Sequence, residues 1–164
     1  MDDGRSLTVR SGIDDEERKR LARRVSSTWG ETVVRRGEAV DPADGELIGA
    51  YADEEIVGVA TYAIRDDECE VVAIEAYQER RGIATVLMDA IRTRAQAAGC
   101  RRLWLVTTND NVPAIAFYQK WGMDLVALRH DSVTEARALL KPDIPEIGYD
   151  DIPIRHELEF AIEP

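Results

Sequence analysis

A small set of basic, hydroxyl and glycine residues surrounds Gly82, where a run with strand character changes to a run with helical spacing. The junction reads Tyr77-Gln78-Glu79-Arg80-Arg81-Gly82-Ile83-Ala84-Thr85. A helix that begins directly after a turn leaves its first N–H groups unpaired, and its dipole favours negative charge there. The small residues would let a phosphate approach the backbone, while Arg80 and Arg81 would add charge and Thr85 a hydroxyl. The junction therefore predicts an anion site, although a tight turn with two solvated arginines would give the same pattern.

Apolar runs on both sides of this turn predict the elements that hold it. Residues 83–98 have helical spacing, and an apolar strand run follows at 103–107. A strand, a crossover helix and another strand in this order predict a parallel, right-handed unit. The Gly82 turn should then lie at the carboxyl end of its strand, where ligands collect. Three earlier strand runs, separated by short polar turns, predict an antiparallel meander at 46–51, 56–64 and 69–76.

The rest of the chain adds elements before and after this unit. They are expected in this order: a strand at 7–10, a helix at 14–28, a short strand at 33–34 within an irregular segment, a helix at 113–121, a strand at 123–128, a helix at 132–141 and a strand at 154–162. The 164 residues have the length of one domain, and no repeat or linker divides them. We therefore expect a single domain over residues 1–164.

The composition excludes several classes of partner. A formal net charge of −11 argues against nucleic acid as a partner, since a phosphate backbone requires a basic face. With 45% hydrophobic and 32% charged residues the composition is that of a globular protein, and no apolar run has the length of a membrane span. The acidic N-terminus lacks the apolar core of a signal peptide, so a cytoplasmic location is expected by default.

The cysteine and histidine content predicts neither disulfides nor a metal centre. Cys69 and Cys100 are too few for a disulfide framework and are expected to be free thiols. His130 and His156 are far apart in sequence, and neither has a nearby ligand partner. No bound metal is therefore expected.

A second stretch with chemical character lies further along the chain and reads Asn111-Val112-Pro113-Ala114-Ile115-Ala116-Phe117-Tyr118-Gln119-Lys120-Trp121-Gly122-Met123. Together with the Gly82 turn and the strand between them, it resembles the GNAT superfamily of acyl-CoA-dependent N-acetyltransferases. The pattern of that superfamily continues from its glycine turn to Asn-x-x-Ala-x-x-Phe-Tyr-x-x-x-Gly-Phe. The resemblance covers residues 46–129. It implies an α/β GNAT fold with a mixed, mostly antiparallel sheet of about six to seven strands flanked by helices.

The resemblance also implies where acetyl-CoA would bind. The backbone of the turn would hold the pyrophosphate, the end of the preceding strand would pair with the pantetheine arm, and Asn111 would contact that arm or fix the neighbouring backbone. The turn residues are Arg80, Arg81, Gly82, Ile83, Ala84 and Thr85, and the strand-end residues are Ile74 and Ala76.

For catalysis, the resemblance implies that Tyr118 is the general acid that protonates the departing thiolate. A phenol suits this task because it stays protonated at neutral pH yet can release its proton to a more basic sulfur. A core aromatic beside Phe117 is the alternative role for this residue. Glu75, at the mouth of the strand, is the expected base, although a solvated acid at a strand end would look the same. Glu70 or Glu68 could serve through a water.

The expected reaction is direct acetyl transfer from acetyl-CoA to an amine on a small molecule or a peptide. The alternative is a catalytically silent, regulatory coenzyme A-binding module of the same fold. A nucleotide-binding protein is disfavoured, because neither a Gly-x-x-x-x-Gly-Lys-Ser/Thr loop nor a Gly-x-Gly-x-x-Gly turn is present. The acceptor pocket is expected between the loops at 29–37 and 141–153 and the strand start at 155–156. A homodimer through the C-terminal strand or an exposed sheet edge is compatible with the sequence.

Overall fold

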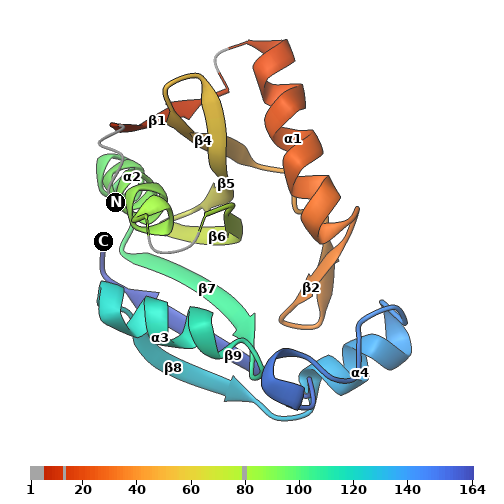
Figure 1. Cartoon of the computed structure of the whole chain (residues 1–164). Helices are drawn as coiled ribbons and strands as arrows, with labels where there is room; N and C mark the ends of the chain where they lie inside the picture. The colour runs from red at the N-terminus through yellow and green to blue at the C-terminus, as the bar shows by residue number, and fades with distance from the viewer. Residues whose placement is uncertain (1–5, 13, 79–80) are drawn as a thin grey trace.

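The computed structural model describes residues 6–12, 14–78 and 81–164, and Figure 1 shows their arrangement. The elements in chain order are β1 (Leu7–Ser11), α1 (Asp15–Trp29), β2 (Val33–Arg35), β3 (Glu38–Val40), β4 (Glu46–Ala52), β5 (Glu55–Arg65), β6 (Glu68–Ala76), α2 (Ile83–Ala97), β7 (Arg102–Thr108), α3 (Val112–Trp121), β8 (Asp124–Arg129), α4 (Ser132–Leu139), a 3-10 turn (Tyr149–Asp151) and β9 (Glu157–Ile162).

Seven of these strands form one sheet in the order β1-β4-β5-β6-β7-β9-β8. Neighbouring strands are antiparallel except β6 and β7, which are parallel and are joined through α2. This arrangement confirms the predicted meander, the predicted crossover unit and the mixed α/β fold. The strand β9 lies between β7 and β8 and is paired on both sides, so among the described residues the open edges of this sheet are β1 and β8.

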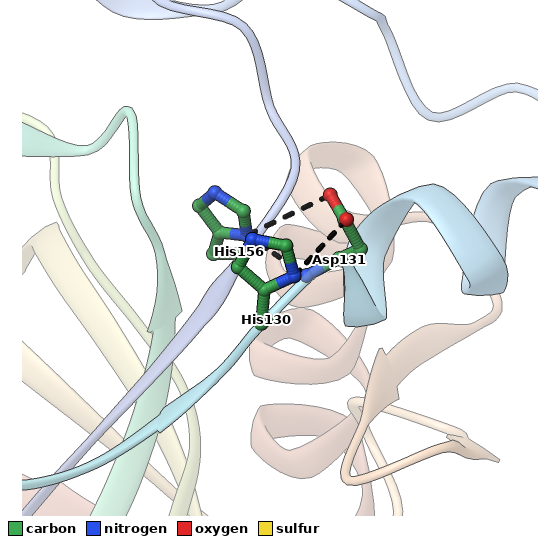
Figure 2. A group of neighbouring side chains, drawn as sticks. All are labelled: His130, Asp131 and His156. Carbon is green, nitrogen blue, oxygen red and sulfur yellow. Dashed lines mark hydrogen bonds and ion pairs between the residues drawn. The ribbon is translucent and has the colours of Figure 1, made fainter.

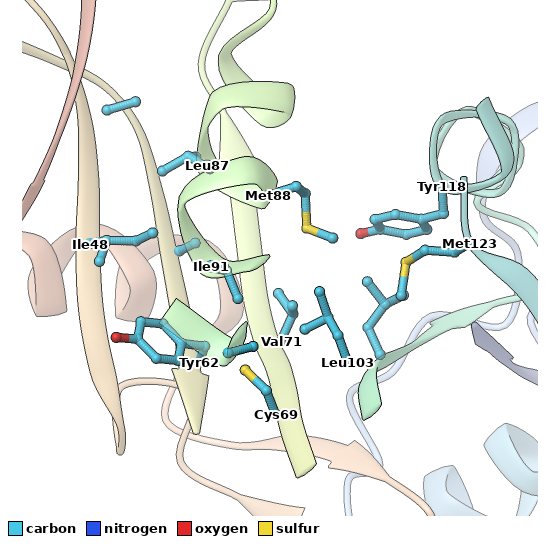
Figure 3. Packing of buried hydrophobic residues seen from close by; sticks show 14 of the residues in the cluster. Ile48, Tyr62, Cys69, Val71, Leu87, Met88, Ile91, Leu103, Tyr118 and Met123 are labelled. Carbon is cyan, nitrogen blue, oxygen red and sulfur yellow. The ribbon is translucent and has the colours of Figure 1, made fainter. Parts of the chain in front are cut away.

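Two apolar clusters lie on the two faces of the sheet. One joins α2 and Tyr118 of α3 to one face, and Figure 3 shows Met88, Tyr118 and Met123 meeting there. The other places Leu21 and Val25 of α1 against the opposite face of β4, β5 and β6. Alternate residues of a strand point to opposite faces, so the strands between these clusters are buried on both sides.

The strands β6 and β7 separate soon after they meet. Their pairing covers only residues 68–70 of β6 and 102–104 of β7, and within the described chain it goes no further. An irregularity in the β5–β6 register follows at once, because Tyr62 pairs with Val71 while Thr61 pairs with Ala73, which leaves Val72 as an extra residue. Such a bulge bends a strand. The carboxyl halves of β6 and β7 therefore enclose a gap.

Two elements differ from the sequence-based expectation. The irregular segment contains a complete hairpin, β2–β3, because Arg36 (φ 50°) and Gly37 (φ 76°) form a tight turn whose backbone matches the twist of paired strands. The last strand begins at Glu157 instead of residue 154. The backbone N–H groups of Arg155 and His156 donate to the Asn109 side chain, at 2.9 and 2.8 Å, and so are used outside the sheet.

Candidate active site

A cavity of about 300 Å³ occupies the gap between β6 and β7. Residues 71–74 of β6 and 106–108 of β7 line it from the sheet. Asn111, Ala114 and Tyr118 of α3 line one side, and the β2–β3 hairpin, the end of α1 and α4 line the other. A parallel pair that separates inside a sheet leaves backbone N–H and C=O groups without a strand partner, so this cavity can receive an extended ligand.

A second hollow, of about 580 Å³, lies toward the opposite end of β6. Charged residues and Trp104 line it, and the guanidinium of Arg36 stacks on the Trp104 ring at 3.6 Å from the ring centre. Neither Tyr118 nor the carboxyl end of β6 is part of its lining in the described structure. Of these two hollows, the cavity between β6 and β7 is therefore the one lined by residues predicted from the sequence, namely Ile74, Asn111 and Tyr118.

The helix α3 carries Tyr118 into this cavity. Asn111 caps the helix by accepting a hydrogen bond from the backbone N–H of Ala114 at 3.3 Å, and the left-handed Gly122 ends it. The Tyr118 ring contacts Phe117 and Phe160, with centroids 5.4 and 5.7 Å away. Burial raises the pKa of Tyr118 to about 12. The phenol is thus part of the apolar core and also part of the cavity wall, and it stays protonated at neutral pH.

The Gly82 turn lies where the sequence places it, at the carboxyl end of β6. Gly82 adopts a left-handed conformation (φ 72°) and precedes α2 without a side-chain cap, while Arg81 and Thr85 are exposed. Ile83 is buried, so only its backbone can face a ligand. The predicted Arg80 lies outside the described residues. The first turn of α2 has the general form of an anion-binding site.

The strand-end residues predicted to meet the cofactor arm are also close to the cavity. Ile74 lines it, and Ala76 pairs with Gly58 on the β5 side of the strand. Both residues pack against the cluster that includes α2. On the β7 side of β6, the described backbone beyond Glu70 has no strand partner. This edge is accessible to an extended arm.

The three acids predicted as base candidates are not among the described residues that line the cavity. Glu75 accepts a hydrogen bond from the hydroxyl of Thr28 on α1. Glu70 is buried and paired with Arg35, with contacts of 2.7 and 3.0 Å. Glu68 lies 3.7 Å from Arg102. None of them is part of the described cavity lining.

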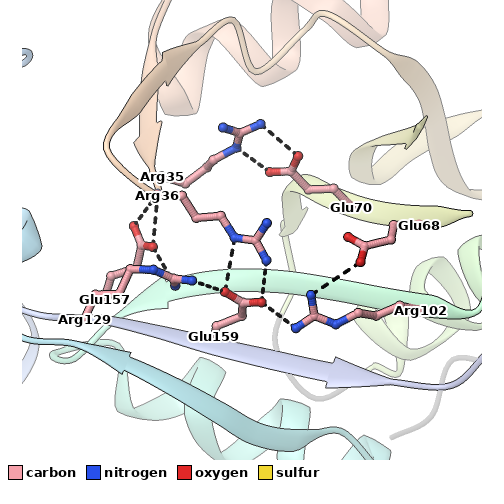
Figure 4. A network of polar contacts seen from close by, with 8 residues as sticks. All are labelled: Arg35, Arg36, Glu68, Glu70, Arg102, Arg129, Glu157 and Glu159. Atoms are coloured by element: carbon pink, nitrogen blue, oxygen red, sulfur yellow. Dashed lines mark hydrogen bonds and ion pairs between the residues drawn. The ribbon is translucent and has the colours of Figure 1, made fainter. Parts of the chain in front are cut away.

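One carboxylate that the sequence reading did not select does line the cavity, namely Glu157 of β9. It accepts hydrogen bonds from the backbone N–H of Arg36 at 3.1 and 3.2 Å and from Arg129 at 3.2 Å (Figure 4). Burial raises its pKa, against the lowering effect of these donors. In the sequence, the alternation of Glu157 with apolar residues is typical of the solvated face of a strand, so the pattern does not mark it as a cavity residue.

Next to it, Glu159 is buried among three guanidinium groups (Figure 4). Arg36, Arg102 and Arg129 each donate to it, with shortest contacts of 2.6 Å. Burial would raise its pKa, but these hydrogen bonds dominate and lower it to about 2. Glu159 therefore stays charged and ties the β2–β3 hairpin to β7 and β8.

The two histidines meet in space, so the expectation that neither has a nearby partner is wrong. His130 and His156 stack with ring centroids 4.6 Å apart, and Asp131 lies beside both (Figure 2). However, Nδ1 of His156 accepts a hydrogen bond from the backbone N–H of Asp131 at 2.8 Å. The Asp131 carboxylate forms an ion pair with Arg155 at 2.9 Å. Nδ1 of His156 and the Asp131 carboxylate therefore already have partners within the protein. The absence of a bound metal stays a prediction.

Both cysteines are buried free thiols, as predicted. Burial raises the pKa of Cys69 to about 12, so its nucleophilic thiolate form is not populated at neutral pH. The cavity lining in the described chain contains neither cysteine.

Comparison with known proteins places the chain in a family. The sequence pattern of the GNAT acetyltransferase family matches residues 13–123, and the chain belongs to this family. The uncharacterized protein YdhI of Bacillus subtilis (strain 168) is 44% identical over 136 residues, which are 81% of this chain and 84% of YdhI. Membership supports, in general terms, an acyl-CoA-dependent acetyltransferase.

Solved structures share the fold. A Bacillus subtilis acetyltransferase in complex with CoA superimposes with a TM-score of 0.71 at 18% identity, covering 97% of this chain and 99% of the other. A GNAT family acetyltransferase from Elizabethkingia anophelis with acetyl-CoA bound gives 0.67 at 17% identity, with 96% and 98% coverage. These comparisons show that the chain shares the fold of the two acetyltransferases. In addition, no helix among the described residues is long and apolar enough to cross a membrane.

Proposed function

We propose that this protein transfers the acetyl group of acetyl-CoA directly to an amine, in the cavity between β6 and β7. The observation that carries the proposal is that Tyr118 lines the gap that opens where β6 and β7 separate. The turn at Gly82 lies at the carboxyl end of β6. Its backbone can therefore bind the pyrophosphate of acetyl-CoA while the pantetheine arm runs along β6. The thioester would then reach the part of the cavity that Tyr118 lines.

In the proposed reaction the amine nitrogen attacks the thioester carbonyl and forms a C–N bond. A backbone N–H among residues 74–76 is a preorganised hydrogen-bond donor, and it stabilises the oxygen of the tetrahedral intermediate. The C–S bond then breaks, and Tyr118 gives its proton to the departing sulfur. Its raised pKa keeps Tyr118 protonated at neutral pH, so the hydroxyl is available as a proton donor to the departing sulfur.

Glu75 is the base proposed from the sequence. Because its carboxylate binds Thr28 and lies outside the described cavity lining, it would have to act through a water. Asn111 would act mainly by holding α3, and thus Tyr118, in place through its cap.

The acceptor is an amine on a small molecule or a peptide, and contacts in the cavity wall favour the small molecule. Lys141, beyond α4, donates to the backbone oxygens of Thr32 at 2.6 Å and Trp29 at 3.4 Å. These bonds join the segment after α4 to the end of α1, and both Lys141 and Trp29 line the cavity. We expect a compact amine to enter the cavity with these bonds intact.

The test is thiol release from acetyl-CoA with a panel of small and peptide amines, with mass detection of the acetylated product. Coenzyme A binding is measured separately by calorimetry. Binding together with product formation supports the proposal. Binding without turnover across the panel favours the silent coenzyme A-binding module, and absence of binding overturns both.

A further inference from the structure

We infer that Glu157 of β9 contacts the acceptor nitrogen and takes its proton during acetyl transfer. The inference rests on the proposed function and assigns to it a residue that the sequence pattern does not mark. The attacking amine must lose a proton as the C–N bond forms, so a carboxylate in contact with the acceptor gives the reaction a base. The described cavity lining contains one carboxylate, and it is Glu157.

The position of Glu157 complements that of Tyr118. On β9, Phe160 contacts the Tyr118 ring on the α3 face of the sheet, at 5.7 Å between centroids. Glu157 is three residues earlier and points to the other face, where its carboxylate meets Arg36 of the β2–β3 turn. In the tetrahedral intermediate, nitrogen and sulfur are different substituents of one carbon. A base and an acid on opposite faces of the gap can therefore serve them at the same time.

The charges around Glu157 leave its carboxylate able to accept a proton. Arg36 faces it with a backbone N–H, Arg129 with one guanidinium nitrogen, and Glu159 with a like charge, while Lys141 lines the same cavity. The stronger contacts of Arg36, Arg102 and Arg129 go to Glu159. Burial accordingly raises the pKa of Glu157, which makes it a stronger base than an exposed carboxylate.

The proton balance closes without a further reactant. Glu157 takes one proton from nitrogen as the C–N bond forms, and Tyr118 gives one to sulfur as the C–S bond breaks. The products are the amide and the free thiol. A proton then passes from Glu157 to Tyr118 through water, which restores both groups for the next turnover.

The experiment compares Glu157→Gln with the wild-type protein over a range of pH, with kcat, KM for the amine, coenzyme A affinity and melting temperature measured for each. We expect kcat to fall by about 100-fold, the magnitude of general base catalysis, with coenzyme A affinity retained. The acid limb of the wild-type pH–rate profile should disappear, since it reports protonation of Glu157. A purely structural role would leave this limb in place.

Two further variants test whether the acid limb belongs to the Glu157 carboxylate. Arg129→Gln removes a cation that lowers the pKa of Glu157, so the acid limb should remain and move to higher pH. Glu157→Asp keeps a carboxylate but moves it away from the acceptor nitrogen. This variant should keep the acid limb with a reduced kcat, and it tests the role of the carboxylate if Glu157→Gln does not fold. The inference is overturned if Glu157→Gln keeps the wild-type rate and limb, or if Glu75→Gln alone removes the limb. Absence of wild-type turnover is a separate result and overturns the proposed function as well.

Discussion

Glu157 and Glu159 lie two residues apart on the same face of β9, and their surroundings move their pKa values in opposite directions. Three arginines converge on Glu159, whereas Glu157 has one weaker arginine contact and a backbone N–H. One acid is thus permanently charged and structural, and the other is buried at the cavity wall. These opposite shifts assign different tasks to the two acids.

Glu159 should stabilise the protein above pH 4.5 and lose this contribution on acidification. Its folded pKa of about 2 lies below the ordinary 4.5, so the stabilisation is complete above 4.5 and disappears as the pH falls toward 2. The shift corresponds to on the order of 3 kcal/mol. Urea unfolding of the wild type and Glu159→Gln should differ most at pH 7 and converge near pH 2. Equal differences at both pH values would contradict this assignment.

Tyr118→Phe should lower kcat by about 100-fold or more and leave the affinity for acetyl-CoA nearly unchanged, since only the proton donor is removed. In the wild type, no alkaline limb from Tyr118 is expected until the pH approaches about 12. Tyr62→Phe is the matched control, because Tyr62 is equally buried in the same cluster but does not line the cavity. Wild-type turnover in Tyr118→Phe would remove the proposed acid.

Gly82→Val should weaken coenzyme A binding and lower the melting temperature, whereas Gly82→Asn should be milder. The left-handed φ of 72° strains a β-branched residue by about 1–2 kcal/mol, and Asn visits this region more readily. A Cβ at this position meets no described atom within 4 Å. The two variants therefore test the effect of backbone strain and not of a steric clash. Calorimetry and thermal unfolding measure the two effects. If both variants bind like the wild type, the conformation of the turn does not matter for the cofactor.

Gly148→Ala should loosen the loop that borders the cavity. A Cβ at Gly148 would lie 1.9 Å from Oδ2 of Asp110, and this buried carboxylate accepts hydrogen bonds from Thr108 and from the backbone N–H of Tyr149. We expect a loss of about 1–3 kcal/mol in unfolding free energy, as for overpacking. Combination with Asp110→Ala in a double-mutant cycle should show non-additive losses, because the two positions are in contact. If the losses in unfolding free energy simply add, the contact between residue 148 and Asp110 is not their cause.

Features of this protein that depend on neighbouring residues could be predicted from its sequence. The apolar runs predicted the meander and the crossover unit, since strand and helix periodicity are properties of neighbouring residues. Asn111, Pro113 and Gly122 marked the limits of α3, because capping and helix termination act within one turn. With the Gly82 turn, these residues were enough to predict the family and the place of Tyr118.

Other features depend on contacts between segments that are distant in sequence, and these could not be predicted. The Asn109 side chain accepts the backbone N–H of Arg155, so β9 begins later than the sequence predicts. The backbone N–H of Arg36, in the β2–β3 turn, donates to Glu157. Burial and three arginines from separate elements set the charge state of Glu159. Pairing of β9 between β7 and β8 placed Glu157 in the cavity wall, while Thr28 held Glu75 on the α1 side. The pKa of an acid depends on charges and burial around it in space, so the sequence could name the carboxylates but not assign their roles.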